Sequence, residues 1–239
     1  MTELLYQTDA YLKEFDSIIT SVDAGSRAVI LERSAFYPGG GGQPCDFGSL
    51  EVEGVTFPVE KVKKQGDDVL HFLGGTTPLP ALNTASRGTL DWARRHKLMR
   101  THTALHILCG SVFRDYGAQV TGGDMDPLKG RMDFEFETMR AELVHDIEAA
   151  VNHEVQQKRE IRVKILPRHE AFKIPDLIRT KINLLPEGIA QVRTVEIVGL
   201  DLQADGGTHV ANTSEVGKIK VVDYKSKGAI NKRIYIEIE

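Results

Sequence analysis

The sequence is poor in cysteine and has no long hydrophobic run, and these absences exclude several classes of protein. Cys45 and Cys109 are its only cysteines, so it has neither a disulfide framework nor a CxxC metal site. No apolar stretch reaches the length of a membrane span, and the first residues resemble neither a signal peptide nor a transit peptide. We therefore expect a cytoplasmic protein without a membrane partner, and nothing in the sequence marks an oligomer interface.

Positive charge is not in excess either. The 30 lysines and arginines are fewer than the 34 aspartates and glutamates, which gives a net charge of −4. A nucleic-acid partner would therefore require a local basic patch, and DNA is not expected as a partner. With 41% hydrophobic residues, the 239-residue chain can bury a core and suits either two small domains or one large one.

The first part of the chain is dominated by short β-branched runs and turn residues. These patterns predict strands over residues 17–23 and 27–33 with a hairpin turn at 23–26, and further strands over 50–62 and 69–73 with a turn at 65–68. A polar, proline-containing stretch at 74–86 closes this section. Residues 1–88 are thus predicted to form a β-rich, barrel-like domain.

Helical spacing of apolar residues begins after this section. It predicts one helix over residues 92–116, ended by Gly117, and a second over 138–157. Strands are predicted at 131–137, 161–166, 190–198, 218–222 and 233–238. Residues 89–239 are therefore expected to form an α+β domain with helices packed on a mostly antiparallel sheet.

Two histidines, His102 and His106, lie four residues apart in the first predicted helix. This spacing places both imidazoles on one helical face, where they can reach one ion, and neutral imidazole suits zinc. The HExxH metalloproteases share the spacing but need a glutamate after the first histidine, and position 103 is Thr. Two unrelated histidines on a helix remain the alternative.

A second candidate segment is the turn from Asp205 to His209, which contains two glycines. Glycines allow a tight turn in which residues 205 and 209 point to one place, and both side chains are competent ligands. Combined with the helical pair, the segment predicts a metal site in which one or both of Asp205 and His209 join His102 and His106, which gives an open or a tetrahedral site. An ordinary loop with a surface histidine is the alternative.

Four consecutive glycines, residues 39–42, form a third feature. The segment lacks the GxxxxGK[ST] pattern and does not open a helix, so it does not indicate a phosphate-binding loop of that type. Either it brings backbone amides and Gln43 close to a ligand, or it forms a tight corner of the β-rich domain.

The fourth feature is a basic C-terminal section. It contains Lys218, Lys220, Lys225, Lys227, Lys232 and Arg233. Such a cluster can neutralise nucleic-acid phosphates, or it can be the solvated face of a strand.

In combination, these segments resemble the free-standing alanyl-tRNA editing proteins, the AlaX type, which are related to the editing domain of alanyl-tRNA synthetase. The resemblance is carried, in order along the chain, by residues 35–44, the HxxxH element at 102–106, and residues 120–123, 131–134, 206–210 and 218–234. Together they span most of the chain, whose length matches the medium-length form of the family.

The resemblance implies a trans-editing enzyme with one zinc ion per chain. Catalysis would depend on His102, His106 and His209, and the amino-acid pocket would include Thr121, in the loop after the helix, Gly122 and Gln43. The family's turn motif is CxxxH, whereas this chain has Asp205 in the cysteine position. Asp205 then either ligates the metal through oxygen or orients a histidine by a hydrogen bond.

The implied reaction is hydrolysis of Ser-tRNA(Ala), and of Gly-tRNA(Ala), with binding of the tRNA acceptor stem and 3′ end. The basic C-terminal section is then the expected contact with the tRNA backbone. Two rival functions remain, a tRNA-binding module with a structural metal and a metal-dependent hydrolase of a small ester or amide.

Overall fold

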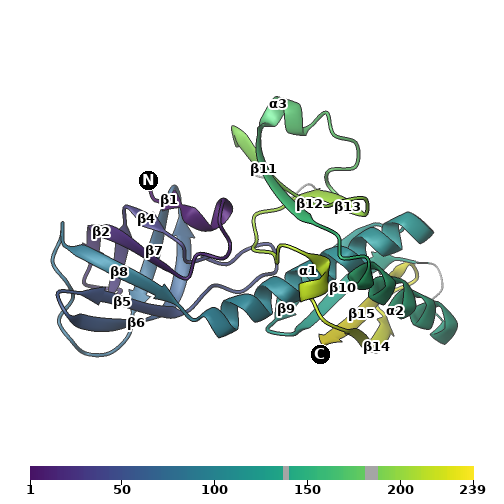
Figure 1. The fold of residues 1–239 in the computed structure, drawn as a ribbon, viewed down its shortest axis with the longest axis horizontal. Coiled ribbons are helices and arrows are strands. Elements are labelled where there is room, and N and C mark those ends of the chain that lie inside the picture. Colours follow the sequence, from purple (N-terminus) through teal and green to yellow (C-terminus); the bar gives the residue numbers. More distant parts are fainter. Residues whose placement is uncertain (137–139, 181–187) are drawn as a thin grey trace. The chain divides into compact units, whose positions relative to one another are not determined.

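A computed structural model describes residues 1–136, 140–180 and 188–239, and the chain divides into two compact units, Met1–His96 and Lys97–Glu239 (Figure 1). The division falls inside a long helix, α1 (Trp92–Tyr116), and thus after the boundary expected at residue 88. The structure is α+β with mostly antiparallel sheets, as the sequence predicts. In the described residues, no helix is long and apolar enough to cross a membrane.

The first unit is a closed six-stranded barrel. Its strands follow the order β2-β3-β7-β6-β5-β8 around the barrel. Their bounds are β2 (Glu14–Asp23), β3 (Ala28–Leu31), β5 (Gly48–Val52), β6 (Val55–Gln65), β7 (Asp68–Leu73) and β8 (Ala85–Leu90). Outside the barrel, β1 (Glu3–Leu4) pairs with β4 (Arg33–Ser34), and a 3₁₀ turn covers Leu5–Gln7.

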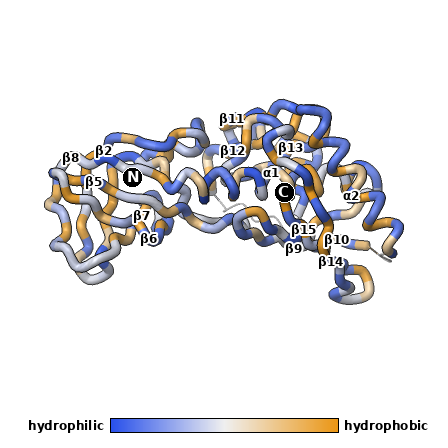
Figure 2. The backbone as a smooth tube through the Cα atoms, turned by 60° about the horizontal axis from the view of Figure 1, so that its bottom comes forward, coloured by the Kyte–Doolittle hydropathy of each residue, from blue (hydrophilic) through white to orange (hydrophobic). Residues whose placement is uncertain are grey.

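Buried residues alternate with less buried ones along β2 and β7, as expected for strands with one face in the core. Figure 2 shows that hydrophobic and hydrophilic residues are interspersed along the barrel strands. Ile19, Val29, Leu31, Leu50 and Val69 form the centre of this core. The predicted hairpins at 23–26 and 65–68 are confirmed by the pairings of Asp23 with Ala28 and of Gln65 with Asp68.

Two details of the barrel differ from the sequence prediction. The expected strand over residues 50–62 is two strands, separated by Glu53 and Gly54, both of which have positive φ and form a tight hairpin turn. The polar stretch at 74–86 does not end the β section, because β8 begins at Ala85 and closes the barrel by pairing with β2 and β5. Its alternation is short and contains Gly88, so the pattern is weak in the sequence.

The glycine-rich segment forms a corner of this unit. Gly40 and Gln43 exchange both backbone hydrogen bonds, at 3.0 and 2.9 Å, around Gly41 and Gly42, and all four glycines from Gly39 to Gly42 have positive φ. The structure thus agrees with the tight-corner interpretation of the segment. The amides of Gly40 and Gln43 are used within the turn itself.

The described residues of the second unit form two antiparallel sheets. The first has the order β14-β15-β10-β9, and the second has the order β11-β12-β13. Their bounds are β9 (Val120–Asp126), β10 (Lys129–Glu135), β11 (Ile161–Pro167), β12 (Gln191–Ile197), β13 (Asp201–Ala204), β14 (Ile219–Ser226) and β15 (Asn231–Ile238). The sequence predicted all of these except β9 and β13, both of which are short or rich in glycine.

Helices complete the second unit. They are the greater part of α1, then α2 (Ala141–Gln156) and the short α3 (Arg168–Ala171), with a 3₁₀ turn at Thr213–Glu215. The bounds predicted for α1 are confirmed, including the left-handed Gly117 that follows it, at φ 66°. The predicted start of the second helix, Thr138, lies outside the described residues. Gly130 of β10 packs directly against Leu105 of α1, so this helix lies against the first sheet.

Candidate metal centre

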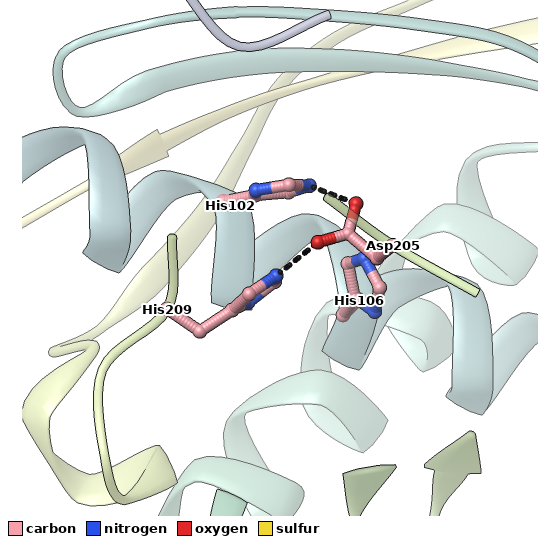
Figure 3. A group of neighbouring side chains, drawn as sticks. All are labelled: His102, His106, Asp205 and His209. Carbon is pink, nitrogen blue, oxygen red and sulfur yellow. Dashed lines mark hydrogen bonds and ion pairs between the residues drawn. The ribbon is translucent and has the colours of Figure 1, made fainter. Parts of the chain in front are cut away.

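Helix α1 supplies the first two residues of the site. His102 and His106 are one turn apart, both are buried, and their ring centroids lie 5.0 Å from each other (Figure 3). The helix between residues 101 and 112 is buried throughout, so these imidazoles are removed from bulk water. The predicted pairing of the two histidines on one helical face is therefore confirmed.

The segment after β13 brings Asp205 and His209 to the same place. One carboxylate oxygen of Asp205, Oδ2, lies 3.0 Å from Nε2 of His209, and the other, Oδ1, lies 3.5 Å from Nε2 of His102 (Figure 3). The amide of Gly207 donates to Oδ2 at 2.8 Å and thereby closes the turn. Gly206 does not adopt positive φ and has room for a Cβ, so the carboxylate, rather than glycine flexibility at 206, shapes this turn.

The four side chains together form a compact group of metal-competent donors. One ligand atom from each of His102, His106, Asp205 and His209 lies within 4.8 Å of all the others. Three imidazole nitrogens and one carboxylate oxygen are a donor set that zinc accepts, and four donors suit its tetrahedral geometry. The group could therefore hold a metal ion.

The protonation states of His102, His209 and Asp205 fit metal binding, whereas the pKa of His106 is raised, which favours its protonated form. Burial lowers the pKa of His102 well below its usual range and that of His209 to about 4, which keeps both imidazoles neutral. Burial also acts to lower the pKa of His106, but Asp201 and Asp205 outweigh it and raise that pKa. Burial opposes ionisation of Asp205, whereas its histidine neighbours outweigh burial and hold the pKa of its carboxyl well below the usual value. Neutral imidazoles and an ionised carboxylate are the forms that bind metals.

Two buried side chains orient this group, and sequence reasoning did not single them out for this role. Oγ1 of Thr103 lies 3.2 Å from Nδ1 of His209 and accepts a hydrogen bond from the amide of Val210. The guanidinium of Arg193 donates to the backbone carbonyl of Asp205 at 2.9 Å and lies 3.7 Å from its carboxylate. Thr103 could have been found in the sequence, because it occupies the position next to the first histidine of the HxxxH element.

The predicted pocket residues are not all in one unit. Thr121 lies in strand β9, not in a loop as expected, at a register shift in the pairing of β9 with β10, and its hydroxyl donates to Oδ1 of Asn231 at 3.0 Å. Gly122 follows in the same strand and pairs with Asp133. Gln43 is a buried residue of the barrel unit.

The basic C-terminal section forms strands β14 and β15 and the turn between them. Lys218 and Lys227 are exposed, whereas Lys232 is buried and donates to the carbonyls of Gly228 and Ala229. The remaining cations are paired with carboxylates: Lys220 with Glu239, Lys225 with Asp223, and Arg233 with Asp133. The C-terminal section therefore presents less positive charge in the structure than its sequence suggests.

Two protein families match separate parts of the chain. Residues 5–94 match the family of class II (A) tRNA synthetases, and residues 192–235 match the second additional domain of threonyl and alanyl tRNA synthetases. The second match includes Asp205 and His209.

Relatives cover the whole length. The chain is 39% identical to the alanyl-tRNA editing protein AlaX-M of Saccharolobus solfataricus and 36% identical to that of Methanosarcina acetivorans, over all of this chain and at least 99% of theirs. It is also 35% identical, over 92% of its length, to 24% of the alanine–tRNA ligase of Ignicoccus hospitalis. The chain therefore belongs to the family of the alanyl-tRNA editing proteins, AlaX-M type.

Proposed function

We propose that this chain deacylates mischarged tRNA(Ala), with Ser-tRNA(Ala) as its main substrate and Gly-tRNA(Ala) as a second. The observation that carries the proposal is the buried group of His102, His106, Asp205 and His209 in a chain that matches AlaX-M proteins over its full length. The scissile bond is the ester between the amino acid and the terminal ribose. An ester is hydrolysed more readily than an amide.

The residues present fit one zinc ion per chain, held by His102, His106, Asp205 and His209. When bound, zinc supplies a positive charge that polarises an ester carbonyl or anchors the substrate. Asp205 in the position of the family's cysteine gives the site an oxygen donor in place of sulfur. The protein's own contribution is to hold these donors in a buried cluster, with Thr103 and Arg193 fixing His209 and Asp205.

Selection of serine over alanine needs a polar partner, because alanine is the smaller side chain. We assign this role to Thr121, with Gly122 beside it in the same strand. The Thr121 hydroxyl donates to Asn231, so its oxygen retains lone pairs that can accept a hydrogen bond from a serine hydroxyl. Thr121 is exposed in the structure, so the bound substrate has to cover it. An alanine ester would then leave this acceptor unpaired, and that cost would supply the discrimination.

The tRNA would be bound through its acceptor stem and 3′ end. An A-form helix offers side chains little access to its major groove, so recognition would depend on shape and backbone contacts. Lys218 and Lys227 are the most suitable of the C-terminal cations for contact with phosphates, because both are exposed.

The test is deacylation of Ser-tRNA(Ala), Gly-tRNA(Ala) and Ala-tRNA(Ala) by the wild type and by His102→Ala. A matched control is His169→Ala, which removes an exposed histidine of the same unit. We expect rapid loss of the serine ester, sparing of the alanine ester, loss of activity in His102→Ala and full activity in His169→Ala.

The same assay separates the two rival functions. Binding of tRNA without cleavage of any ester would favour a tRNA-binding module with a structural metal. Cleavage of a small amino-acid ester at the rate of the tRNA ester would favour a small-molecule hydrolase. Either result would reject the proposal.

A further inference from the structure

A buried carboxylate outside the four-residue group faces one of its histidines. Asp201 is the first residue of β13, and its side chain is fully buried. One of its oxygens, Oδ2, lies 3.2 Å from Nδ1 of His106. Nδ1 of His106 is buried and makes no regular hydrogen bond among the described residues, so the Asp201 carboxylate at this distance is the acceptor that lies beside it.

The Asp201 carboxylate is held in place by further donors. The side-chain amide of Gln203 donates to Oδ2 at 2.6 Å, and Nε of Arg179 lies 3.5 Å from Oδ1. Gln203 also contacts the sulfur of Cys109, and the Arg179 guanidinium stacks over the ring of Phe113. Both partners are thus fixed against α1, the helix that carries His106, so the carboxylate has little freedom to turn away.

Helix α1 is shaped to let this carboxylate approach. A Cβ at Gly110 would lie 2.9 Å from the Cβ of Asp201 and 3.0 Å from Leu200, closer than such atoms pack. Glycine is an unfavourable residue inside a helix, and Gly110 lies well within α1. The close approach of Asp201 explains why a glycine stands there, one turn beyond His106.

Histidines that ligate metals usually donate the N–H of their other ring nitrogen to a carboxylate or carbonyl, which fixes the tautomer and the ring orientation. With Nδ1 of His106 facing Asp201, Nε2 is the nitrogen left for the group with His102, Asp205 and His209. We propose that Asp201 is a positioning residue whose carboxylate accepts a hydrogen bond from Nδ1–H of His106 and so presents Nε2 of that ring as a metal ligand.

This inference rests on the proposed metal site and extends it to a residue beyond the four donors. The two carboxylates of residues 201–205 then have different roles. Asp205 is one of the proposed metal ligands, whereas Asp201 orients the ligand His106. Gln203, Arg179 and Gly110 then serve to place Asp201.

The experiment measures zinc affinity by competition with a chromophoric chelator, using the full-length protein stripped of metal. The variants are Asp201→Ala, Asp201→Asn and Gly110→Ala, and the matched control is Asp223→Ala, an exposed carboxylate of the same unit. We expect Asp201→Ala to bind zinc about 10- to 100-fold more weakly than the wild type. Asp201→Asn should be intermediate, because its side-chain carbonyl can still accept a hydrogen bond from Nδ1–H, and Asp223→Ala should be unchanged.

A second readout is the visible absorption of the cobalt-loaded protein, which reports ligand geometry and not folding. It should change in Asp201→Ala and Gly110→Ala and stay constant in Asp223→Ala. If Asp201→Ala does not fold, the zinc affinity and the cobalt spectrum of Asp201→Asn and Gly110→Ala test the proposal instead.

Zinc affinity and a cobalt spectrum equal to wild type in the folded Asp201 variants would overturn the inference and leave the proposed function intact. A wild-type protein that binds no zinc, or a His102→Ala variant that binds it normally, would overturn the metal site itself and with it the role of Asp201.

Discussion

His71 is a buried histidine of the barrel, distant in sequence from the histidines of the proposed site. Its Nε2 lies 2.7 Å from the Ser34 hydroxyl, and its Nδ1 lies 3.3 Å from the carbonyl of Val29. Burial lowers its pKa to about 4 from the ordinary 6.5. The unfolded chain therefore takes up a proton below about pH 6.5 that the folded protein refuses until about pH 4, and stability is lost as the pH falls through this window.

The shift corresponds to about 3 kcal/mol of unfolding free energy. We expect a His71→Gln variant to lose about that much less stability than the wild type between neutral pH and pH 4. Urea unfolding of both proteins, followed by circular dichroism across this range, measures the difference. His102, His106 and His209 titrate in both proteins, so their contributions cancel in the comparison, and parallel curves would contradict the assigned role of His71.

The site residues show how far single residues can be predicted from sequence. His102 and His106 could be paired because helical spacing is local, and Asp205 and His209 because a short turn joins them. Asp201 could not be recognised, since only the tertiary approach of β13 to Gly110 brings its carboxylate to His106. Arg193 could not be recognised either, because it lies in a strand whose other residues have the pattern of a core element.

At the scale of elements, the first turn of α1 is anchored to the glycine-rich corner by a buried ion pair. The guanidinium of Arg95 donates to both oxygens of Asp46 and to the carbonyls of Ala10 and Ala35, and both side chains are almost fully buried. The Asp46 carboxylate also accepts a hydrogen bond from the backbone amide of Tyr37. The pair thus joins three segments of the barrel unit that are far apart in sequence.

Removing one partner of this pair leaves the other charge buried and uncompensated. We expect Arg95→Met to lower the free energy of unfolding by about 3–5 kcal/mol. The exposed pair of Arg87 with Glu14 is the matched control, and Arg87→Ala should cost less than about 1 kcal/mol. Denaturant unfolding of both variants measures the two changes in the free energy of unfolding. Equal changes would show that the buried Arg95 pair stabilises the fold no more than the exposed pair does.

Elements were predicted well where the pattern was long and poorly where glycine interrupted it. The 25 residues of α1 carry enough apolar periodicity to fix both ends, with Gly117 as the stop signal. Strand β9 contains Gly122 and Gly123, and it becomes a strand only by pairing with β10. Strand β8 is likewise defined by its neighbours, since its pairing with β2 and β5 closes the barrel.

At the scale of the whole molecule, the sheet formed by β9, β10, β15 and β14 determines how charge is presented. Three of the six C-terminal cations, Lys220, Lys225 and Arg233, pair with carboxylates, and two cations of β10 do the same. The ion pairs are Lys129 with Glu237, Arg131 with Asp124, Lys220 with Glu239, Lys225 with Asp223 and Arg233 with Asp133. The net charge of the chain is −4, and these ion pairs neutralise half of the cations in the C-terminal section. We therefore expect its contact with tRNA phosphates to depend on the exposed lysines that have no carboxylate partner.

Salt dependence of tRNA binding distinguishes cations that neutralise phosphates from those that hold the fold. Each lysine that contacts a phosphate contributes about 1 to the slope of log affinity against log salt. We expect the double variant Lys218→Ala, Lys227→Ala to reduce this slope by about 2, measured by fluorescence anisotropy with tRNA(Ala) over a range of potassium chloride. Lys232→Met should leave the slope unchanged, because the Lys232 ammonium is used by the carbonyls of Gly228 and Ala229. A slope that falls for Lys232→Met but not for the double variant would show that the turn between β14 and β15 reopens on binding. A slope constant in all variants would move the phosphate contacts away from this sheet altogether.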